Sequence, residues 1–172
     1  MSSSKPGGEK SKQQQVLFIP KTLRWCPMPA PLDKDANRLP TVLKTPDFPV
    51  PCRRCLQDSQ VGDEMLLLSY DPFLGDSPYR CASPIFLHSK PSCELAASPT
   101  ALPEQQRGRL LSVRAYDGKH MMVDADVVDG NKVVEVCQRM LEEEGSSAEY
   151  CHVHYAMQGC FAVRVDKASA AN

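Results

Sequence analysis

Residues 111–128, LSVRAYDGKHMMVDADVV, carry the strongest structural signal in this sequence. On each side of Asp117-Gly118, apolar and polar side chains alternate, which is the pattern of a half-buried strand. The Asp-Gly step between the two runs is typical of a tight turn. The stretch therefore predicts a β-hairpin.

An amphipathic helix and two further strands are predicted after the hairpin. Asp129-Gly-Asn131 supplies residues typical of a helix start, and residues 132–144 place apolar side chains at helical spacing up to Gly145. Residues 150–155 and 161–165 predict two more strands around a turn at Gly159. This order predicts an α+β fold, in which a small, mostly antiparallel sheet carries one main amphipathic helix packed on one face.

The N-terminal half is less regular. Residues 64–70 and 84–88 are apolar enough to predict two buried strands, and residues 103–108 predict one helical turn. Prolines are frequent from residue 20 to residue 51 and exclude long helices there. We therefore expect an irregular Pro-rich extended arm over 16–50, lying on a single domain that spans 51–167. Residues 1–15 and 168–172 are expected to be disordered tails.

Charge and hydropathy exclude some classes of function. The chain has 20 basic and 21 acidic side chains, a formal net charge of -1, whereas a nucleic-acid-binding protein normally has a basic excess. No apolar run approaches the ~20 residues that span a bilayer, and the polar N-terminus lacks the apolar core of a secretory signal. We expect a soluble cytoplasmic protein with no nucleic-acid or membrane partner. Serine and lysine near the start leave a mitochondrial leader open.

Reactive and charged side chains are expected on one face of the C-terminal sheet. Residues two apart on a strand share a face. If the apolar set of each strand faces the helix, the opposite face carries Arg114, Tyr116, Asp124, Asp126, His152, His154, Cys160 and Arg164. Such a face is either the solvated side of an antiparallel sheet or the wall of a cleft roofed by the first two strands and the arm.

The first functional hypothesis is a binding module without chemistry. Guanidinium groups suit carboxylates and phosphates, so Arg114 and Arg164, beside His152, would hold a small anion or an acidic peptide. We prefer this hypothesis, because the sequence has no Gly-rich phosphate loop, no nucleophile elbow and no His-Glu-x2-His motif.

The second hypothesis is a small enzyme. His152-Val-His154 places two imidazoles on one side of a strand, where they would be structural, would handle protons or a ligand, or would share a metal ion. In the enzyme, either histidine is the general base, Asp124 orients it and Arg114 stabilises a developing anion. Cys160 would be the nucleophile, activated by a neighbouring imidazole.

The third hypothesis concerns the cysteines. Eight cysteines without a secretory signal are better interpreted as thiols, metal ligands or buried apolar side chains than as disulfides. Cys52-Arg-Arg-Cys55 has the spacing of half a zinc knuckle, which His88 and Cys93 would complete. Coincidence and a redox dithiol with arginine-lowered thiol pKa are the alternatives. A zinc site here would indicate a structural subunit of a larger assembly.

Several short segments, in this order along the chain, resemble the family called domain of unknown function 1203. They are Pro51-Cys-Arg-Arg, Gly62-Asp-Glu-Met-Leu-Leu-Leu-Ser-Tyr, Ser77-Pro-Tyr-Arg80, Pro84-Ile-Phe, Leu110-Leu-Ser-Val-Arg-Ala-Tyr-Asp117, Met122-Val-Asp-Ala-Asp-Val-Val-Asp-Gly130, His152-Val-His154 and Gly159-Cys-Phe. The resemblance covers about residues 45 to 167. It implies one compact domain and no established activity, cofactor or partner.

The chain departs from the family pattern at two candidate zinc ligands. That pattern commonly shows serine where this chain has Cys55, and arginine where it has His88. The resemblance therefore favours the sheet face over the cysteine pair. It also adds Tyr79 and Arg80 as ligand-binding candidates in a loop at the cleft mouth, although Pro78 suits a plain turn there.

Overall fold

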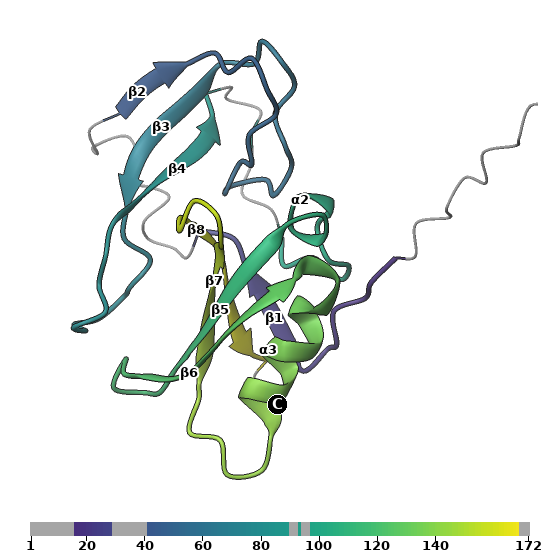
Figure 1. The fold of residues 1–172 in the computed structure, drawn as a ribbon, viewed down its shortest axis with the longest axis vertical. Helices are drawn as coiled ribbons and strands as arrows, with labels where there is room; N and C mark the ends of the chain where they lie inside the picture. The colour runs from purple at the N-terminus through teal and green to yellow at the C-terminus, as the bar shows by residue number, and fades with distance from the viewer. Residues whose placement is uncertain (1–15, 29–40, 90–92, 94–96, 169–172) are drawn as a thin grey trace, which may run out of the picture.

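The computed structural model describes residues 16–28, 41–89, 93 and 97–168, and it contains two antiparallel sheets (Figure 1). The larger sheet has five strands, in the spatial order β1 (Leu23–Cys26), β8 (Phe161–Lys167), β7 (Tyr150–Tyr155), β5 (Leu110–Tyr116) and β6 (Met122–Asp129). The smaller sheet has the order β2 (Thr41–Lys44), β3 (Met65–Tyr70) and β4 (Ser83–His88). The expected mostly antiparallel architecture is confirmed, but its strands form two sheets instead of one.

Short helices complete the described part of the chain. They are α2 (Glu104–Arg107), the 3-10 helix η2 (Gly130–Lys132) and α3 (Val133–Glu142). The Asp129 side chain accepts a hydrogen bond from the backbone N–H of Asn131, as its place at a helix start predicts. No helix within the described residues is both long and apolar enough to span a membrane.

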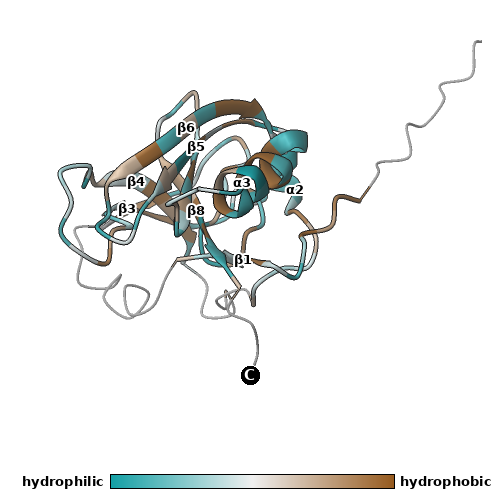
Figure 2. Ribbon diagram, turned by 90° about the horizontal axis from the view of Figure 1, so that it is seen from below, coloured by the Kyte–Doolittle hydropathy of each residue, from teal (hydrophilic) through white to brown (hydrophobic). Residues whose placement is uncertain are grey.

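The main core lies between α3 and the five-stranded sheet. Val133, Cys137, Met140 and Leu141 form the buried side of α3, and Figure 2 shows hydrophilic and hydrophobic residues together on this helix. They join the alternate residues of β5, such as Val113, in one buried cluster. Packing of an amphipathic helix on one face of the sheet is thus confirmed.

The described parts of the expected arm are not irregular throughout. Strand β1 forms an edge of the larger sheet, with Trp25 opposite Val165 of β8. The Trp25 side chain is 0% exposed, and its Nε1 donates to Oε1 of Gln106 at 2.7 Å. The prediction of a surface arm is therefore wrong for these residues. Prolines adjoin β1 and β2 without interrupting them, so the two short strands keep their hydrogen bonds.

The rest of the arm, residues 29–40, and the expected tails at 1–15 and 168–172 lie outside the described residues, except Ala168, whose N–H donates to the Thr22 carbonyl at 2.7 Å. The smaller sheet contacts the larger one through Phe161 of β8. This ring belongs to the buried cluster of β3 and β4, with its centroid 5.6 Å from that of Tyr70. The two sheets therefore meet around the start of β8, close to the loop that carries Cys52.

Candidate metal centre

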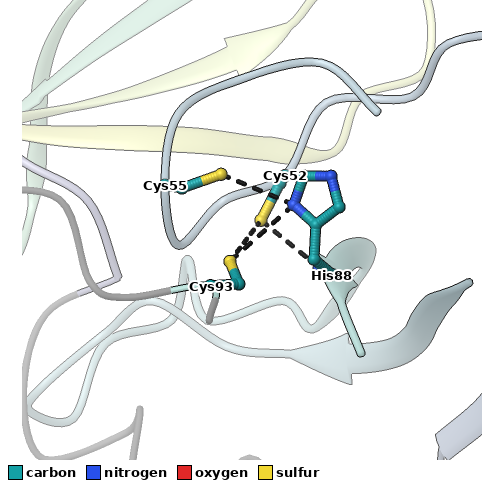
Figure 3. A group of neighbouring side chains, drawn as sticks. All are labelled: Cys52, Cys55, His88 and Cys93. Carbon is teal, nitrogen blue, oxygen red and sulfur yellow. Dashed lines mark hydrogen bonds between the residues drawn. The ribbon is translucent and has the colours of Figure 1, made fainter. Parts of the chain in front are cut away.

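Four side chains with metal-binding atoms converge at the end of the smaller sheet (Figure 3). We call Cys52, Cys55, His88 and Cys93 the Cys3His cluster. His88 is the last residue of β4, and Cys52 lies in a loop that forms a parallel bridge with Phe86 of the same strand. Cys55 follows in this loop, and Cys93 comes from the chain beyond β4. The cluster thus joins three separate chain segments.

The ligand atoms of the cluster all lie within 4.8 Å of one another. The Sγ atoms of Cys52 and Cys93 are 3.7 Å apart. The Nδ1 atom of His88 is 3.5 Å from Sγ of Cys55 and 3.7 Å from Sγ of Cys93. The group is therefore compact enough that one metal ion could contact all four atoms.

Hydrogen bonds favour a thiolate within the cluster. The backbone N–H of His88 donates to Sγ of Cys52 at 3.4 Å. A hydrogen bond from the Cys55 thiol, assisted by backbone N–H groups, lowers the pKa of the buried Cys52 to about 4. The same pairing raises the pKa of Cys55, and burial raises that of Cys93. Cys52 is thus the thiol best prepared to bind a cation, since the thiolate is the ligating form.

The loop of the Cys-x2-Cys motif has a local structure that turns both cysteines inward. Cys52 N–H donates to the carbonyl of Gln57 at 3.0 Å, closing the loop, while Arg53 N–H donates to the carbonyl of Phe86 at 3.0 Å. Leu56 takes the left-handed conformation with φ 57°, which is uncommon for a branched side chain. The loop therefore holds an unfavourable backbone angle directly after Cys55.

The sheet-face residues are only partly brought together. Register places His152 between Arg114 of β5 and Arg164 of β8. His152 is 0% exposed, and the Phe73 ring lies edge-on to it at 4.8 Å. The guanidinium of Arg164 already has two partners within the protein. Its Nε donates to Asp166 at 2.6 Å, and it lies 3.8 Å from the Tyr150 ring centroid. The face is covered around His152.

Both histidines of this face are held neutral. Burial, reinforced by the nearby positive groups, lowers the pKa of His152 to about 2 and that of His154 to about 4. His154 Nδ1 contacts the carbonyl of Gly159 at 3.1 Å. Within the described residues, both ring nitrogens of His152 and Nε2 of His154 have no hydrogen-bond partner.

The two acidic residues lie on the other face, so their expected placement needs correction. Asp124 is opposite Ala115 and Asp126 opposite Val113, both of which face α3. Their carboxylates lie 3.3 Å and 3.7 Å from the guanidinium of Arg139 on α3. A register shift between Ala115 and Tyr116 adds one residue to β6 and reverses its faces. Asp124 therefore does not contact either histidine in this arrangement.

The remaining candidates have other neighbours. Cys160 is buried, and its Sγ accepts a hydrogen bond from Nη2 of Arg53 at 3.0 Å. Tyr116 is also buried, and the ring of Tyr79 lies against it with the centroids 6.1 Å apart. Arg80 is exposed and pairs with Asp71 at 2.8 Å. The loop that contains Tyr79 and Arg80 thus covers part of the sheet face.

Sequence reasoning missed two residues that shape the cluster. A carboxylate oxygen of Asp63 lies 3.7 Å from Nε2 of His88. The sequence feature that could have indicated this residue is the Gly62-Asp63 turn before β3. From the sequence, Arg53 is expected only to be a cation beside the thiols. Its side chain instead leaves the cluster and donates to the Phe161 carbonyl at 2.8 Å, a contact across the two sheets that local sequence does not encode.

Comparison with known proteins identifies a family. The family model described as protein of unknown function (DUF1203) matches residues 49–167, a range that contains the whole Cys3His cluster and the histidines of β7. No curated protein and no solved structure matches the chain.

Proposed function

The chain belongs to the family of proteins of unknown function DUF1203, and from its own residues we propose that it is a structural zinc-binding module. The Cys3His cluster would hold one zinc ion at the end of the smaller sheet. The observation that carries the proposal is the set of separations between ligand atoms. Zn–S bonds of about 2.3 Å and Zn–N bonds of about 2.0 Å at tetrahedral angles place two sulfurs about 3.8 Å apart, and sulfur and nitrogen about 3.5 Å apart. In the cluster, Sγ of Cys52 lies 3.7 Å from Sγ of Cys93, Nδ1 of His88 lies 3.5 and 3.7 Å from the sulfurs of Cys55 and Cys93, and all ligand atoms lie within 4.8 Å of one another.

The ligand types support zinc and a structural role. Three cysteines and one histidine form one of the usual ligand sets of structural zinc, whereas calcium and magnesium take oxygen ligands. A catalytic zinc requires an open coordination position for water or substrate, and four protein ligands leave none. Zinc would therefore tie the Cys52 loop to β4 and to the chain segment at Cys93.

The redox alternative for Cys52 and Cys55 has less support. A disulfide requires sulfurs about 2.0 Å apart and no further ligand, while the cluster adds a third sulfur and an imidazole. All eight cysteines lie in the described part of the chain, and none is in a disulfide. A metal site accounts for all four side chains, whereas a dithiol accounts for two.

The test is elemental analysis of the full chain purified without an affinity tag. We expect about one zinc per chain. Cys55→Ser and Cys93→Ser should each lower zinc retention on dialysis at least about tenfold, since one of four ligands is lost. Cys81→Ser is the matched control, because Cys81 is exposed and outside the cluster, and it should retain the metal.

Cobalt(II) substitution gives a second readout that reports the ligand sphere. Tetrahedral sulfur ligation produces intense visible absorption, which should appear in the wild type and the Cys81→Ser variant and weaken in Cys93→Ser. Zinc below about a tenth of an equivalent per chain, together with no cobalt spectrum in the reduced protein, would overturn the proposal.

A second candidate function is binding of a small anion or an acidic peptide at the sheet face. It is supported by the buried ring nitrogens of His152 and His154 that lack partners among the described residues. Arg114 would bind the anion, and an enzymatic version would use one of the histidines as proton acceptor. Binding of phosphate or citrate is measured by NMR titration. Phe73→Ala should strengthen this binding, because Phe73 covers His152. Arg114→Met should abolish the binding. If the titrated spectra of both variants match those of the wild type, this candidate function is excluded.

A further inference from the structure

A cavity of about 420 Å³ lies where the two sheets meet, outside the Cys3His cluster. Phe48, Val50, Pro84 and Phe86 form its apolar wall on the side of the smaller sheet. Tyr155 and Cys160, from the end of β7 and the turn before β8, form the opposite wall. This volume falls within the range of small-molecule sites, which are usually apolar with a few polar groups. Phe48 is 63% exposed, so this part of the wall is accessible from solvent.

The charges around this cavity are one-sided. Among the described residues, two arginines and no acidic side chain line it, and the guanidinium carbons of Arg53 and Arg109 lie 5.0 and 5.4 Å from the Tyr155 ring centroid. Arg109 is bound to the Asp58 carboxylate by hydrogen bonds of 3.0 and 3.1 Å. Its charge is therefore balanced, although its side chain stays 31% exposed.

Arg53 differs from Arg109, because its partners are all uncharged. Nε donates to the Phe161 carbonyl, Nη1 to the Pro51 carbonyl and Nη2 to the Cys160 sulfur. The residue is 1% exposed, and its hydrogen bonds within the described structure go to two carbonyls and a sulfur, not to a carboxylate. The thiolate of the neighbouring Cys52 offsets part of the Arg53 charge, but burying a cation without a carboxylate partner remains costly. An anion in the adjoining cavity would lower that cost.

We propose that this cavity binds a small molecule with a carboxylate and an apolar, preferably aromatic, body. The carboxylate lies at the Arg53 and Arg109 end, where guanidinium groups recognise it. The apolar body lies against Phe48 and Phe86. Binding here involves neither the ligand atoms of the Cys3His cluster nor the histidines of the sheet face.

The test compares two probes of matched shape with the full chain. 1-Naphthoate carries the carboxylate, and 1-naphthalenemethanol is its neutral counterpart. Calorimetric or NMR titration should give a dissociation constant at least about tenfold lower for the naphthoate, which corresponds to the net contribution of one charge-assisted hydrogen bond. Because an exposed charge contributes, this preference should decrease at high salt.

Two variants locate the site, and a third controls for charge. Gln158 lines the cavity and is exposed, so Gln158→Trp should block it and abolish binding without altering the circular dichroism spectrum. Arg109→Met should remove most of the preference for naphthoate. Arg139→Met is the control, because Arg139 is an equally ion-paired surface arginine on α3 and should leave binding unchanged.

Three outcomes would overturn the proposal. They are equal affinity for the two probes, wild-type affinity in a folded Gln158→Trp protein, and absence of any binding up to the solubility of naphthoate. Arg53→Met cannot decide the question, since loss of its two buried hydrogen bonds, to Phe161 and Cys160, would also destabilise the contact between the sheets.

Discussion

The carboxylate of Asp63 lies 3.7 Å from Nε2 of His88, while Nδ1 of the same ring faces the sulfurs of Cys55 and Cys93. The two ring nitrogens thus have separate partners, one carboxylate and one group of sulfurs. Asp63 is itself held by the backbone N–H of Gln60 at 2.9 Å. A carboxylate behind a ligating imidazole fixes its tautomer and makes it a stronger donor to the metal.

Asp63→Asn should therefore weaken zinc binding without removing a ligand. We expect zinc affinity to fall by about tenfold, the lower end for loss of such a partner. Competition with a chromophoric chelator measures this value. Asp76→Asn is the matched control, because Asp76 is fully exposed and pairs only with Arg80 among the described residues. Equal affinities in the two variants would argue against a role for Asp63.

His152→Phe should stabilise the protein at neutral pH. Both ring nitrogens are buried without a partner in the described structure, and aromatic rings surround the side chain, with Phe73 and Phe161 at 4.8 and 5.5 Å. Removing unsatisfied polar atoms should raise the free energy of unfolding by about 1 kcal/mol, measured by urea denaturation. His154→Phe should destabilise, since it leaves the Gly159 carbonyl without its ring contact. The opposite order would show that His152 has a polar partner.

The same histidines should make stability depend on pH. Their folded pKa values of about 2 and about 4 lie below the ordinary value of 6.5. Between pH 6.5 and 4 the unfolded chain therefore binds more protons, and the free energy of unfolding falls as pH falls. The slope should approach about 1.4 kcal/mol per pH unit for each imidazole. His152→Phe should reduce the slope of the free energy of unfolding against pH by the contribution of one imidazole. The wild type and this variant both keep the Cys3His cluster, so any loss of metal at low pH affects them equally.

Trp25→Ala should show that β1 belongs to the core. Removing a fully buried indole, with its hydrogen bond to Gln106, should lower the free energy of unfolding by about 3–5 kcal/mol. Far-UV circular dichroism follows the transition, since Trp25 is the single tryptophan. Phe18→Ala, at a side chain that is 74% exposed, should cost less than about 0.5 kcal/mol. Similar losses in both variants would indicate a loosely attached segment.

Gly130→Ala should destabilise the junction between α2 and η2. A Cβ atom at this position would overlap the backbone oxygens of Gln106 and Arg107. Backbone cannot move aside as a flexible side chain does, so we expect a loss of about 1–3 kcal/mol in thermal or urea unfolding. Gly108→Ala is the control, because its nearest atom would be the Glu104 oxygen at 3.9 Å. Equal stability of the two variants would contradict the close approach.

The limits of sequence reasoning are clearest in β6. Alternation correctly predicted the hairpin with β5, because a strand pattern is local. Alternation assigned Asp124 and Asp126 to the wrong face of the sheet. One extra residue in β6 moves every following side chain to the other face. No feature of residues 121–128 reveals that irregularity, which depends on how β5 pairs with them.

The sequence by itself determined the elements of the C-terminal half and the Cys52–Cys55 spacing, because turn chemistry, alternation and helical period act over a few neighbouring residues. It also named His88 and Cys93 as the closing ligands, without grounds to prefer them. Only tertiary structure brings these four side chains together. The pairing of β3 with β4 places His88 opposite Met65, and the bridge from Cys52 to Phe86 brings the loop beside it. Metal ligands need proximity in space, and hydrogen bonds between distant segments provide it.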